Sequence, residues 1–484
     1  MNIPLPRAAL AATLAALLAG CMVGPDYHRP PVPMPAQFKP LPGWTPAAPG
    51  EADLPKGPWW TPFHDPLLDK LEPQVAVSNQ TVAQSYANYQ AALAEVKEAR
   101  SALFPTIGIS GAGTKARSAS ESTFTSSRPS ISTSGSLEGT ASWAPDLWGK
   151  VRRGLEQSKA TAQASRATLA NATLSEQAAL ATAVIELRAT DASIDLQQQA
   201  VAAYTESLRV VQNQSIAGTI APSDEISART QLENARSSLL SLGIARAQYA
   251  HAIAVLVGKN PEDLDIPHDA TLPSLPMVPA GVPSTLLQRR PDIAVAERQM
   301  AAQNAAIGVA EAAYYPTLSL SGADGFSQSP LAGLLHLANH VWSLGADVGA
   351  TLFDGGERSG EVTAARADYE AAVANYRGTV LGALQNVEND LSGLSILAQQ
   401  SDVQDAAARD ATRGAEIAQN EYQAGTVDYT TVATAQATEF SSRQNALGVH
   451  EQQLLDTVSL IGDLGGGWSA DELGKAPQNP GRSP

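Results

Sequence analysis

Cysteine is nearly absent from this chain of 484 residues, because Cys21 is the only one. A single cysteine excludes a disulfide within the chain and any metal site built from several thiolates. Aromatic residues are also scarce, at 5%, and charged residues reach only 17%. Ala, Ser, Gln, Thr and Gly supply much of the rest, a composition that favours long packed helices over a compact enzyme core.

Basic residues are outnumbered by acidic ones, with 32 Lys and Arg against 48 Asp and Glu, so the net charge is −16. A surface that binds nucleic acid needs a basic patch, and the sequence contains none. No Ser-His-Asp or phosphate-loop signature stands out. His336 and His340 are four residues apart, but Leu337 stands where a zinc protease would carry Glu. We therefore expect no enzymatic activity, metal or soluble cofactor.

Residues 1–20 have the pattern of a signal peptide, with Arg7 followed by an apolar run too short to span a bilayer comfortably. The sequence LAGC, ending at Cys21, resembles a bacterial lipobox, in which cleavage leaves a lipidated cysteine. Met22 at the next position resembles lipoproteins sorted to the outer membrane. We therefore expect Cys21 to carry acyl chains such as palmitate. An ordinary signal peptide with an incidental cysteine is the alternative.

Proline dominates the next segment, residues 21–65. Twelve prolines lie between Pro25 and Pro62, too many for a helix or a central strand. The segment is expected to form an extended, polyproline-like arm.

The stretch Arg289–Leu320 changes its period abruptly. Pro291 and Asp292 suit the first turn of a helix, and Ala-rich sequence follows as far as Tyr315-Pro316. From Thr317 onward, polar and apolar residues alternate, as in a strand with unlike faces. The same change occurs at Phe104-Pro105, after a helical pattern over 67–103. The expected strands are 106–113, 131–143, 317–326 and 341–353, with a loop over 115–130.

Leucine and other aliphatic residues recur every seven positions after the first strand pair, at Leu180, Leu187, Ile194, Val201 and Leu208. This spacing indicates coiled-coil packing of a very long helix, from Lys150 to about Gln214, roughly 100 Å in length. Gly218 and Thr219 end it, and a return helix is expected from Pro222 to about Val257.

This order of elements occurs twice in the chain. The turn at Gly218-Thr219 has its counterpart at Gly425-Thr426, and the two aromatic-Pro steps correspond in the same way. We assign the first repeat to residues 66–260, a crossing linker to 261–284, the second repeat to 285–464 and a flexible tail to 465–484.

Two repeats provide four strands, and four strands cannot close a barrel. An open sheet edge cannot face lipid, since its backbone groups would lack hydrogen-bond partners. Several chains would therefore have to complete the barrel. Aromatic residues at or beyond the strand ends fit the girdle of a membrane barrel, with a soluble core as the alternative: Trp143, Trp148, Trp342 and Phe353.

These landmarks resemble one family, the TolC-like outer-membrane factors, and most closely their NodT/OprM-type lipoprotein branch. The resemblance rests on the lipobox with GPDYHRP, the segment RRPDIAVAERQ, Trp143–Gly149 and the paired Ala-Gly-Thr turns. It implies a mixed α and β membrane protein: a homotrimer with a twelve-stranded barrel, four strands from each chain, continued by a long α-helical barrel through the periplasm.

The resemblance also implies a function. The trimer would be the passive outer-membrane exit duct of a tripartite multidrug efflux system, in contact with outer-membrane lipid. A periplasmic adaptor protein and an inner-membrane pump, of the RND type, would be its partners. Two alternatives are the exit duct of a type I protein secretion system and a structural coiled-coil lipoprotein without a pore.

In this family the periplasmic end is narrowed by residues just after the glycine turns, often aspartates. The matching positions here are Thr431 and Thr434, beside Thr430, and their first-repeat equivalents are Asp224 and Ser227. Only Asp224, with Glu225, could supply negative charge there; the alternative is that both acids merely start a helix. The hairpin ends at Gly218, Thr219, Gly425 and Thr426 resemble the family's adaptor-docking tips.

Overall fold

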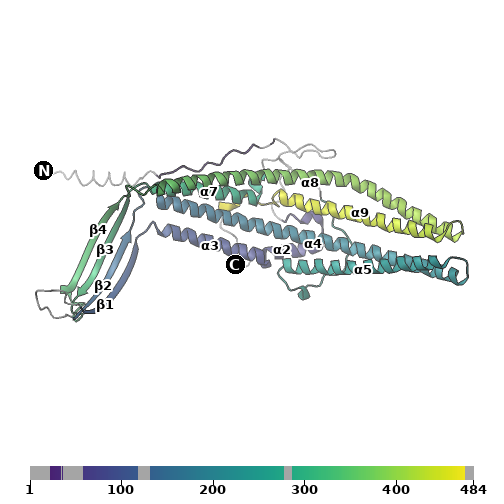
Figure 1. The fold of residues 1–484 in the computed structure, drawn as a ribbon, viewed down its shortest axis with the longest axis horizontal. Helices are drawn as coiled ribbons and strands as arrows, with labels where there is room; N and C mark the ends of the chain where they lie inside the picture. The colour runs from purple at the N-terminus through teal and green to yellow at the C-terminus, as the bar shows by residue number, and fades with distance from the viewer. Residues whose placement is uncertain (1–21, 34, 36–57, 118–130, 277–285, 475–484) are drawn as a thin grey trace. The chain divides into compact units, whose positions relative to one another are not determined.

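The computed structural model describes residues 22–33, 35, 58–117, 131–276 and 286–474 (Figure 1). The expected lipidation site Cys21 and the expected signal peptide lie outside these ranges. So do most of the Pro-rich arm, residues 118–130, and parts of the predicted linker and tail.

The elements follow one another twice in the same order. The first half contains α2 (Pro66–Ser78), α3 (Gln80–Ser101), β1 (Thr106–Arg117), β2 (Ile131–Trp143), α4 (Lys150–Ile216) and α5 (Pro222–Leu256). The second half contains α6 (Leu286–Arg289), α7 (Pro291–Ala312), β3 (Thr317–Gln328), β4 (His340–Gly349), α8 (Glu357–Gln423) and α9 (Tyr429–Asp463). Short 3-10 turns occur at Thr61–Phe63, Pro261–Asp263, Leu337–Asn339 and Ala470–Gly474.

Equivalent helices in the two halves have equal lengths. Both α3 and α7 have 22 residues, α4 and α8 have 67, and α5 and α9 have 35. This agreement confirms the two tandem structural repeats predicted from the sequence.

Contacts divide the chain into two compact units, and each unit draws on both repeats. Among the described residues, one unit comprises 22–30, 90–117, 131–164 and 296–376, and so includes all four strands. The other includes the return helices α5 and α9. Neither repeat forms a unit by itself.

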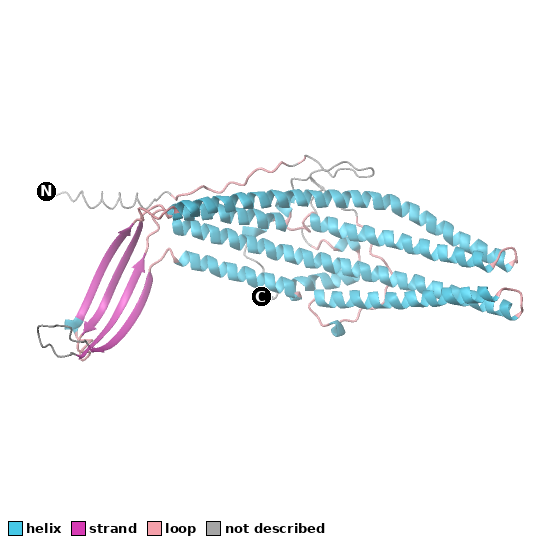
Figure 2. Cartoon of the chain, in the orientation of Figure 1, coloured by secondary structure: helices cyan, strands magenta, loops and turns pink. Residues whose placement is uncertain are grey.

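The strands form one antiparallel sheet in the order β1-β2-β3-β4 (Figure 2). Opposite residues in the ladder share a face, so the register assigns each side chain to one side. One face carries the large apolar residues Ile107, Ile109, Leu137, Trp143, Leu318, Leu320, Phe326, Trp342, Leu344 and Val348. The other face is mainly Ser, Thr, Ala and Gly. All strand ends that continue into helices, at Thr106, Trp143, Thr317 and Gly349, lie at one end of the sheet.

The predicted seven-residue pattern produces a buried stripe along the long helices. Leu180 and Leu187 are fully buried in α4, and Val380 and Val387 are fully buried in α8. Large aliphatic side chains at this spacing pack helix against helix, which is what holds the long hairpins together.

Two predicted strand boundaries are wrong by four residues each. The fourth strand ends at Gly349 rather than Phe353, because Gly349 pairs with Thr317 and the preceding Pro316 has no N–H to continue the ladder. Leu352 and Phe353 are therefore exposed outside the strand. The first strand extends beyond 113 into the predicted loop, as far as Arg117, because β2 offers partners up to Ile131.

The helical region over 67–103 is broken at Asn79. The Asn79 side-chain oxygen accepts hydrogen bonds from the backbone N–H groups of Thr81 and Val82, so this residue starts a new helix. Its amide nitrogen donates to Glu176 and to the carbonyl of Leu256, which fixes the break against α4 and α5.

Candidate functional site: the helical hairpin ends

Two hairpins, α4–α5 and α8–α9, end in the same kind of turn. Gly218 and Gly425 have φ angles of 70° and 75°, a left-handed conformation that glycine adopts without strain. Thr219 N–H donates to the Gln214 carbonyl, and Thr426 N–H donates to the Glu421 carbonyl, both at 3.0 Å. Each threonine hydroxyl donates to the same carbonyl.

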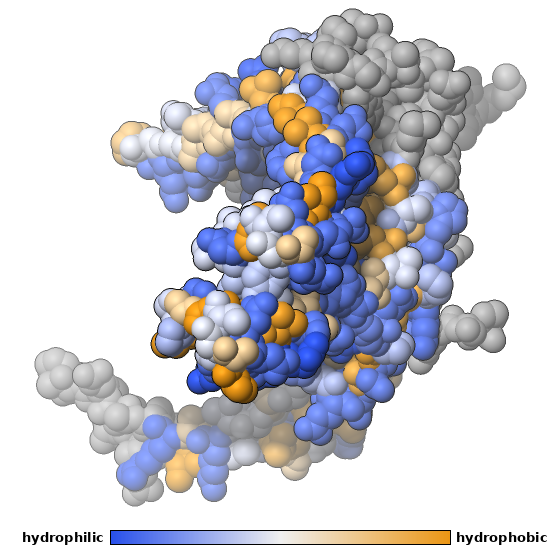
Figure 3. Space-filling view, turned by 90° about the vertical axis from the view of Figure 1, so that its right-hand side faces the viewer, coloured by the Kyte–Doolittle hydropathy of each residue, from blue (hydrophilic) through white to orange (hydrophobic). Residues whose placement is uncertain are grey.

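Nothing in the described chain packs on these turns. A Cβ atom added to Gly218 or Gly425 would meet no atom within 4 Å, and all four predicted tip residues are exposed. Apolar residues nearby are also exposed, with Ile216 at 87% and Ile226 at 66%. On the face that carries the turns, apolar groups are scattered among polar ones (Figure 3). The tips thus present exposed backbone and isolated apolar side chains to a partner.

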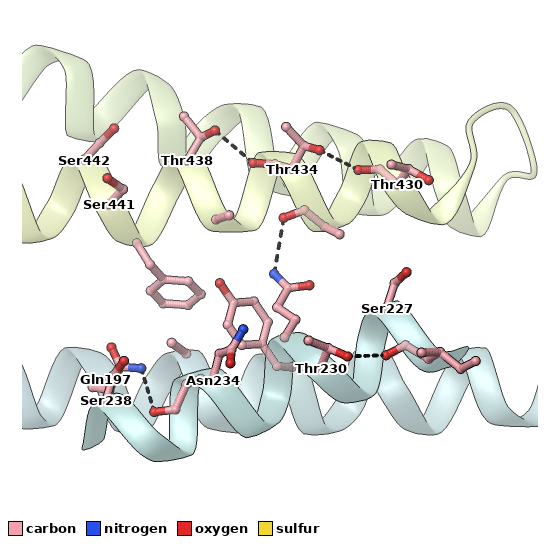
Figure 4. Close-up of a pocket in the computed structure, with 18 residues that line it drawn as sticks. Gln197, Ser227, Thr230, Asn234, Ser238, Thr430, Thr434, Thr438, Ser441 and Ser442 are labelled. Carbon is pink, nitrogen blue, oxygen red and sulfur yellow. Dashed lines mark hydrogen bonds between the residues drawn. The ribbon is translucent and has the colours of Figure 1, made fainter. Parts of the chain in front are cut away.

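A hydroxyl-lined groove of about 970 Å³ lies between α5 and α9, with α4 behind it. Three of the predicted gate residues, Ser227, Thr430 and Thr434, line this groove from its two sides (Figure 4). The Thr434 hydroxyl donates to the carbonyl of Thr430, and that of Thr438 donates to the carbonyl of Thr434. Their methyl groups and neutral oxygens make this lining polar but uncharged.

Thr431, the remaining predicted gate residue of α9, contacts the start of its own helix. Its backbone N–H and its hydroxyl both donate to Asp428, at 2.9 and 2.7 Å, so Asp428 caps α9. These bonds hold the pKa of Asp428 below its usual range. We did not predict Asp428, although an Asp just before a helical run is a recognisable start signal.

Asp224 lies in the first turn of α5, next to two tyrosines. Burial raises the pKa of Tyr429 to about 12 and also raises that of Tyr422, and the negative charge of Asp224 adds to both shifts. The two phenol rings are 6.1 Å apart. Asp224 thus lies near the hairpin end, where its charge acts on these two tyrosines.

Tyr422 joins the two hairpins, because its hydroxyl on α8 donates to the Gln214 side chain on α4. Tyr429 packs beside it against the buried residues Val211 and Ala228. Further along, the rings of Tyr204 and Phe440 meet edge to face at 5.6 Å, and Gln231 donates to the Ala433 carbonyl at 3.3 Å. These contacts hold the hairpins together on both sides of the groove.

The N-terminal segment GPDYHRP docks on the AERQ part of α7 and on the start of α4. Arg153, only 1% exposed, donates to the carbonyls of Val23 and Gly24 and pairs with Asp26 at 2.9 Å. Gly24 lies against Gly308 so closely that a Cβ on Gly24 would be 2.4 Å from the Gly308 Cα.

Tyr27 completes this attachment. Its hydroxyl donates to Glu297, and the guanidinium of Arg298 lies 5.7 Å from its ring centre. The two sequence segments that suggested the family are thus partners in the fold.

Among the described residues, no cluster of three or more His, Cys, Asp or Glu could hold a metal ion. His340 instead pairs with Asp324 across the sheet at 2.8 Å, and His336 precedes the short turn at Leu337.

The family profile described as outer membrane efflux protein matches residues 71–259 and 282–466, one range in each half of the chain. The chain belongs to the outer membrane efflux protein family. It is 29% identical over 472 residues to the probable efflux pump outer membrane protein TtgC of Pseudomonas putida, covering 96% of both chains. It is also 29% identical over 385 residues to nodulation protein T of Rhizobium leguminosarum bv. trifolii, covering 78% of this chain and 79% of that one.

Solved structures agree with this assignment. The outer-membrane channel OprN is 28% identical and superposes with a TM-score of 0.82, over 93% of this chain and all of the other. The open state of the Neisseria gonorrhoeae MtrE outer membrane channel superposes at 0.81 with 24% identity, over 93% and 99% of the two chains. The protein is therefore an outer-membrane protein with the fold of efflux channels.

Proposed function

We propose that three copies of this chain form the passive exit duct of a tripartite efflux system. The observation that carries the proposal is the four-stranded sheet, whose two edges, β1 and β4, have no further strand partner within the described chain. One face is apolar and the other is rich in hydroxyl groups. In lipid, an open edge leaves backbone groups unsatisfied, so the sheet needs neighbours.

Three copies would supply twelve strands, above the minimum of about eight for known single-chain barrels. The apolar face would contact lipid and the Ser/Thr face would line water. Both edge strands are exposed along their whole length, which leaves them free to pair with neighbouring copies. An amphipathic sheet with open edges fits a membrane channel. A structural coiled-coil rod would not need such a sheet, so we prefer the channel.

The free hairpin ends support a docking role. A periplasmic adaptor protein would contact the tips at Gly218, Thr219, Gly425 and Thr426, and an inner-membrane pump of the RND type would supply energy through it. The chain's own residues then need no catalytic step. Relatives are named as efflux pump components for antibiotics and toluene, so small drugs or other organic compounds are the proposed cargo rather than secreted proteins.

The hairpin ends would also form the gate. Three copies of the groove with Ser227, Thr430 and Thr434 would narrow the duct by packing, and Thr431 would act only through the α9 cap. Asp224 would provide negative charge near the opening. Opening requires the hairpins to separate, and this breaks the hydrogen bond between Tyr422 and Gln214.

The N-terminal arm would bring a lipid anchor to the barrel. Val23 N–H donates to the carbonyl of Trp148 at 3.1 Å, two residues after Cys21. Trp148 stacks on Tyr315 at 4.8 Å, close to the helix-to-strand junction at Pro316. Acyl chains on Cys21 would therefore enter the membrane beside aromatic residues that favour its interface.

Planar-bilayer recordings test the duct and its gate together. Wild type should insert as a channel with low conductance, and Tyr422→Phe, which removes only the hydroxyl, should open more often. Tyr369→Phe is the matched control, because Tyr369 lies in the first turns of α8, whereas Tyr422 is near its last residue, and Tyr369 is not part of the groove. Protein that inserts but never conducts, with or without the substitution, would contradict the proposal.

A further inference from the structure

The charged residues of the sheet are divided between its two faces. Among the four strands, which are described completely, the basic residues are Lys115, Arg117 and His340, and the register places all three on the apolar face. The opposite face carries only the acids Glu138 and Asp347. The chain has a net charge of −16, so basic residues confined to the proposed lipid-facing side of the sheet are unexpected.

The one acid on the apolar face is already paired. Asp324 accepts a hydrogen bond from the Nε2 atom of His340 at 2.8 Å. Lys115 and Arg117 lie farther along β1, opposite Thr133 and Ile131, and both are exposed. Among the described residues, no acid pairs with Lys115 or Arg117, so the described part of the apolar face carries two unpaired cations in each copy of the sheet.

The position of Lys115 and Arg117 along β1 places them at a membrane surface in the proposed barrel. Trp143 and Thr133 lie ten residues apart on β2, about 34 Å at 3.4 Å per residue. With a strand tilt of about 40°, this is roughly 26 Å along the membrane normal, close to the ~25 Å apolar band of such barrels. If Trp143 marks one margin of the band, Lys115 and Arg117 stand at the other.

That other margin is the outer one. The helices leave the sheet at the Trp143 end, and in the proposed duct they extend into the periplasm. Lys115 and Arg117 then face the outer leaflet at the level of its head groups. β1 is an edge strand, so each pair lies where two copies would join.

The loop that follows β3 lies close to the basic pair and carries exposed leucines. The loop after β3 crosses β2 here, since the Ser329 hydroxyl donates to the Thr133 carbonyl and Leu331 covers Gly135. Leu331, Leu335 and Leu337 are 45%, 64% and 84% exposed. Positive charge beside exposed leucines matches a molecule with phosphate groups above acyl chains.

We propose that Lys115 and Arg117 bind the phosphate groups of an outer-leaflet glycolipid, with three such sites on the trimer. Lys and Arg both donate to phosphate oxygens through charge-assisted hydrogen bonds, and Arg can do so with two at once. A lipid with two phosphate groups can place one phosphate beside each cation. A lipid with a single phosphate group leaves one of the two cations without a phosphate partner. This inference rests on the proposed outer-membrane duct.

Native mass spectrometry of the full-length protein in detergent, titrated with diphosphoryl lipid A, tests the proposal. Wild-type trimers should retain up to three lipids. One cation near an anionic lipid is worth about fivefold in affinity, so Lys115→Gln with Arg117→Gln should weaken binding about 25-fold. The charge-keeping exchange of Lys115→Arg with Arg117→Lys should retain it. Lys70→Gln in α2 with Lys259→Gln just after α5 removes equal charge from exposed sites outside the sheet and should change nothing.

The lipid source is tested in the same experiment. Phosphatidylglycerol should bind more weakly than lipid A, and millimolar inorganic phosphate should not displace the lipid. Trimers of the Gln double variant that bind lipid A as wild type does would overturn this inference alone. Equal binding of phosphatidylglycerol, or displacement by free phosphate, would overturn the glycolipid assignment. Protein that forms no trimer at all would instead overturn the proposed duct.

Discussion

Glu72 gives the sharpest prediction about stability. It is fully buried in α2 among Leu68, Leu71 and Val75, and neither carboxyl oxygen has a hydrogen-bond partner within the described chain. Burial without a partner disfavours the charged form and raises the pKa of Glu72 from 4.5 to about 9. The folded protein therefore keeps this carboxyl protonated at neutral pH.

The raised pKa makes stability depend on pH in a definite direction. Between pH 4.5 and about 9 the folded state binds a proton that the unfolded state has lost, so stability falls as pH rises. A difference of one pKa unit is worth 1.36 kcal/mol. Protonating Glu72 on folding therefore lowers the free energy of unfolding by about 1 kcal/mol at pH 5 and by about 4 kcal/mol at pH 7.5. The pH-dependent part is thus about 3 kcal/mol, as an upper limit.

Glu72→Gln removes this cost, because the amide has nearly the same shape and never ionises. The variant should exceed wild type in stability by about 1 kcal/mol at pH 5 and by up to about 4 kcal/mol at pH 7.5, a gain of about 3 kcal/mol between the two pH values. Guanidinium denaturation in detergent, followed by circular dichroism at both pH values, measures the difference. Glu95→Gln, on the exposed side of α3, is the control. A variant that gains no stability over wild type between the two pH values would refute the reasoning.

Four further outcomes follow from other contacts. Cys21→Ser should abolish lipid labelling without preventing folding, and labelling that persists would exclude the lipobox. Asp224→Asn should lower cation preference in bilayer recordings, read as a shift in reversal potential; an unchanged potential would remove Asp224 from the gate. Gly308→Ala should loosen the N-terminal segment, because the new methyl group would lie 2.8 Å from Arg153, and proteolysis near the N-terminus should accelerate. Burial and the neighbouring acids Asp463 and Asp456 raise the pKa of Asp390 to about 7, so Asp390→Asn should flatten the loss of stability as pH rises from about 4 to 7, measured by the same denaturation.

The architecture could be predicted from the sequence because its signals are local and repeated. Pro316 and Pro105 mark where helix becomes strand, and leucines such as Leu180 and Leu187 recur at the spacing of a coiled coil. Each signal also occurs in the other half of the chain. The boundaries that failed depend on partners instead: β4 ends at Gly349 because the partner strand ends there, and Asn79 breaks a helix through contacts with α4 and α5.

The contacts of the candidate gate residues could be predicted only in part, because several of them also depend on distant partners. Counting from the turns located Ser227, Thr430 and Thr434 in one groove, because a repeat preserves spacing. It could not distinguish Thr431, whose hydroxyl faces Asp428 at the helix start. The bond between Tyr422 and Gln214 joins residues 208 positions apart, and no sequence period connects them.

The central claim is that one chain supplies a third of a membrane barrel, and the mass of the purified particle tests it most directly. Native mass spectrometry in detergent should give three copies of the mature chain, without a stable monomer. A stable, folded monomer would contradict the account, since its sheet would keep two open edges that a membrane cannot accommodate.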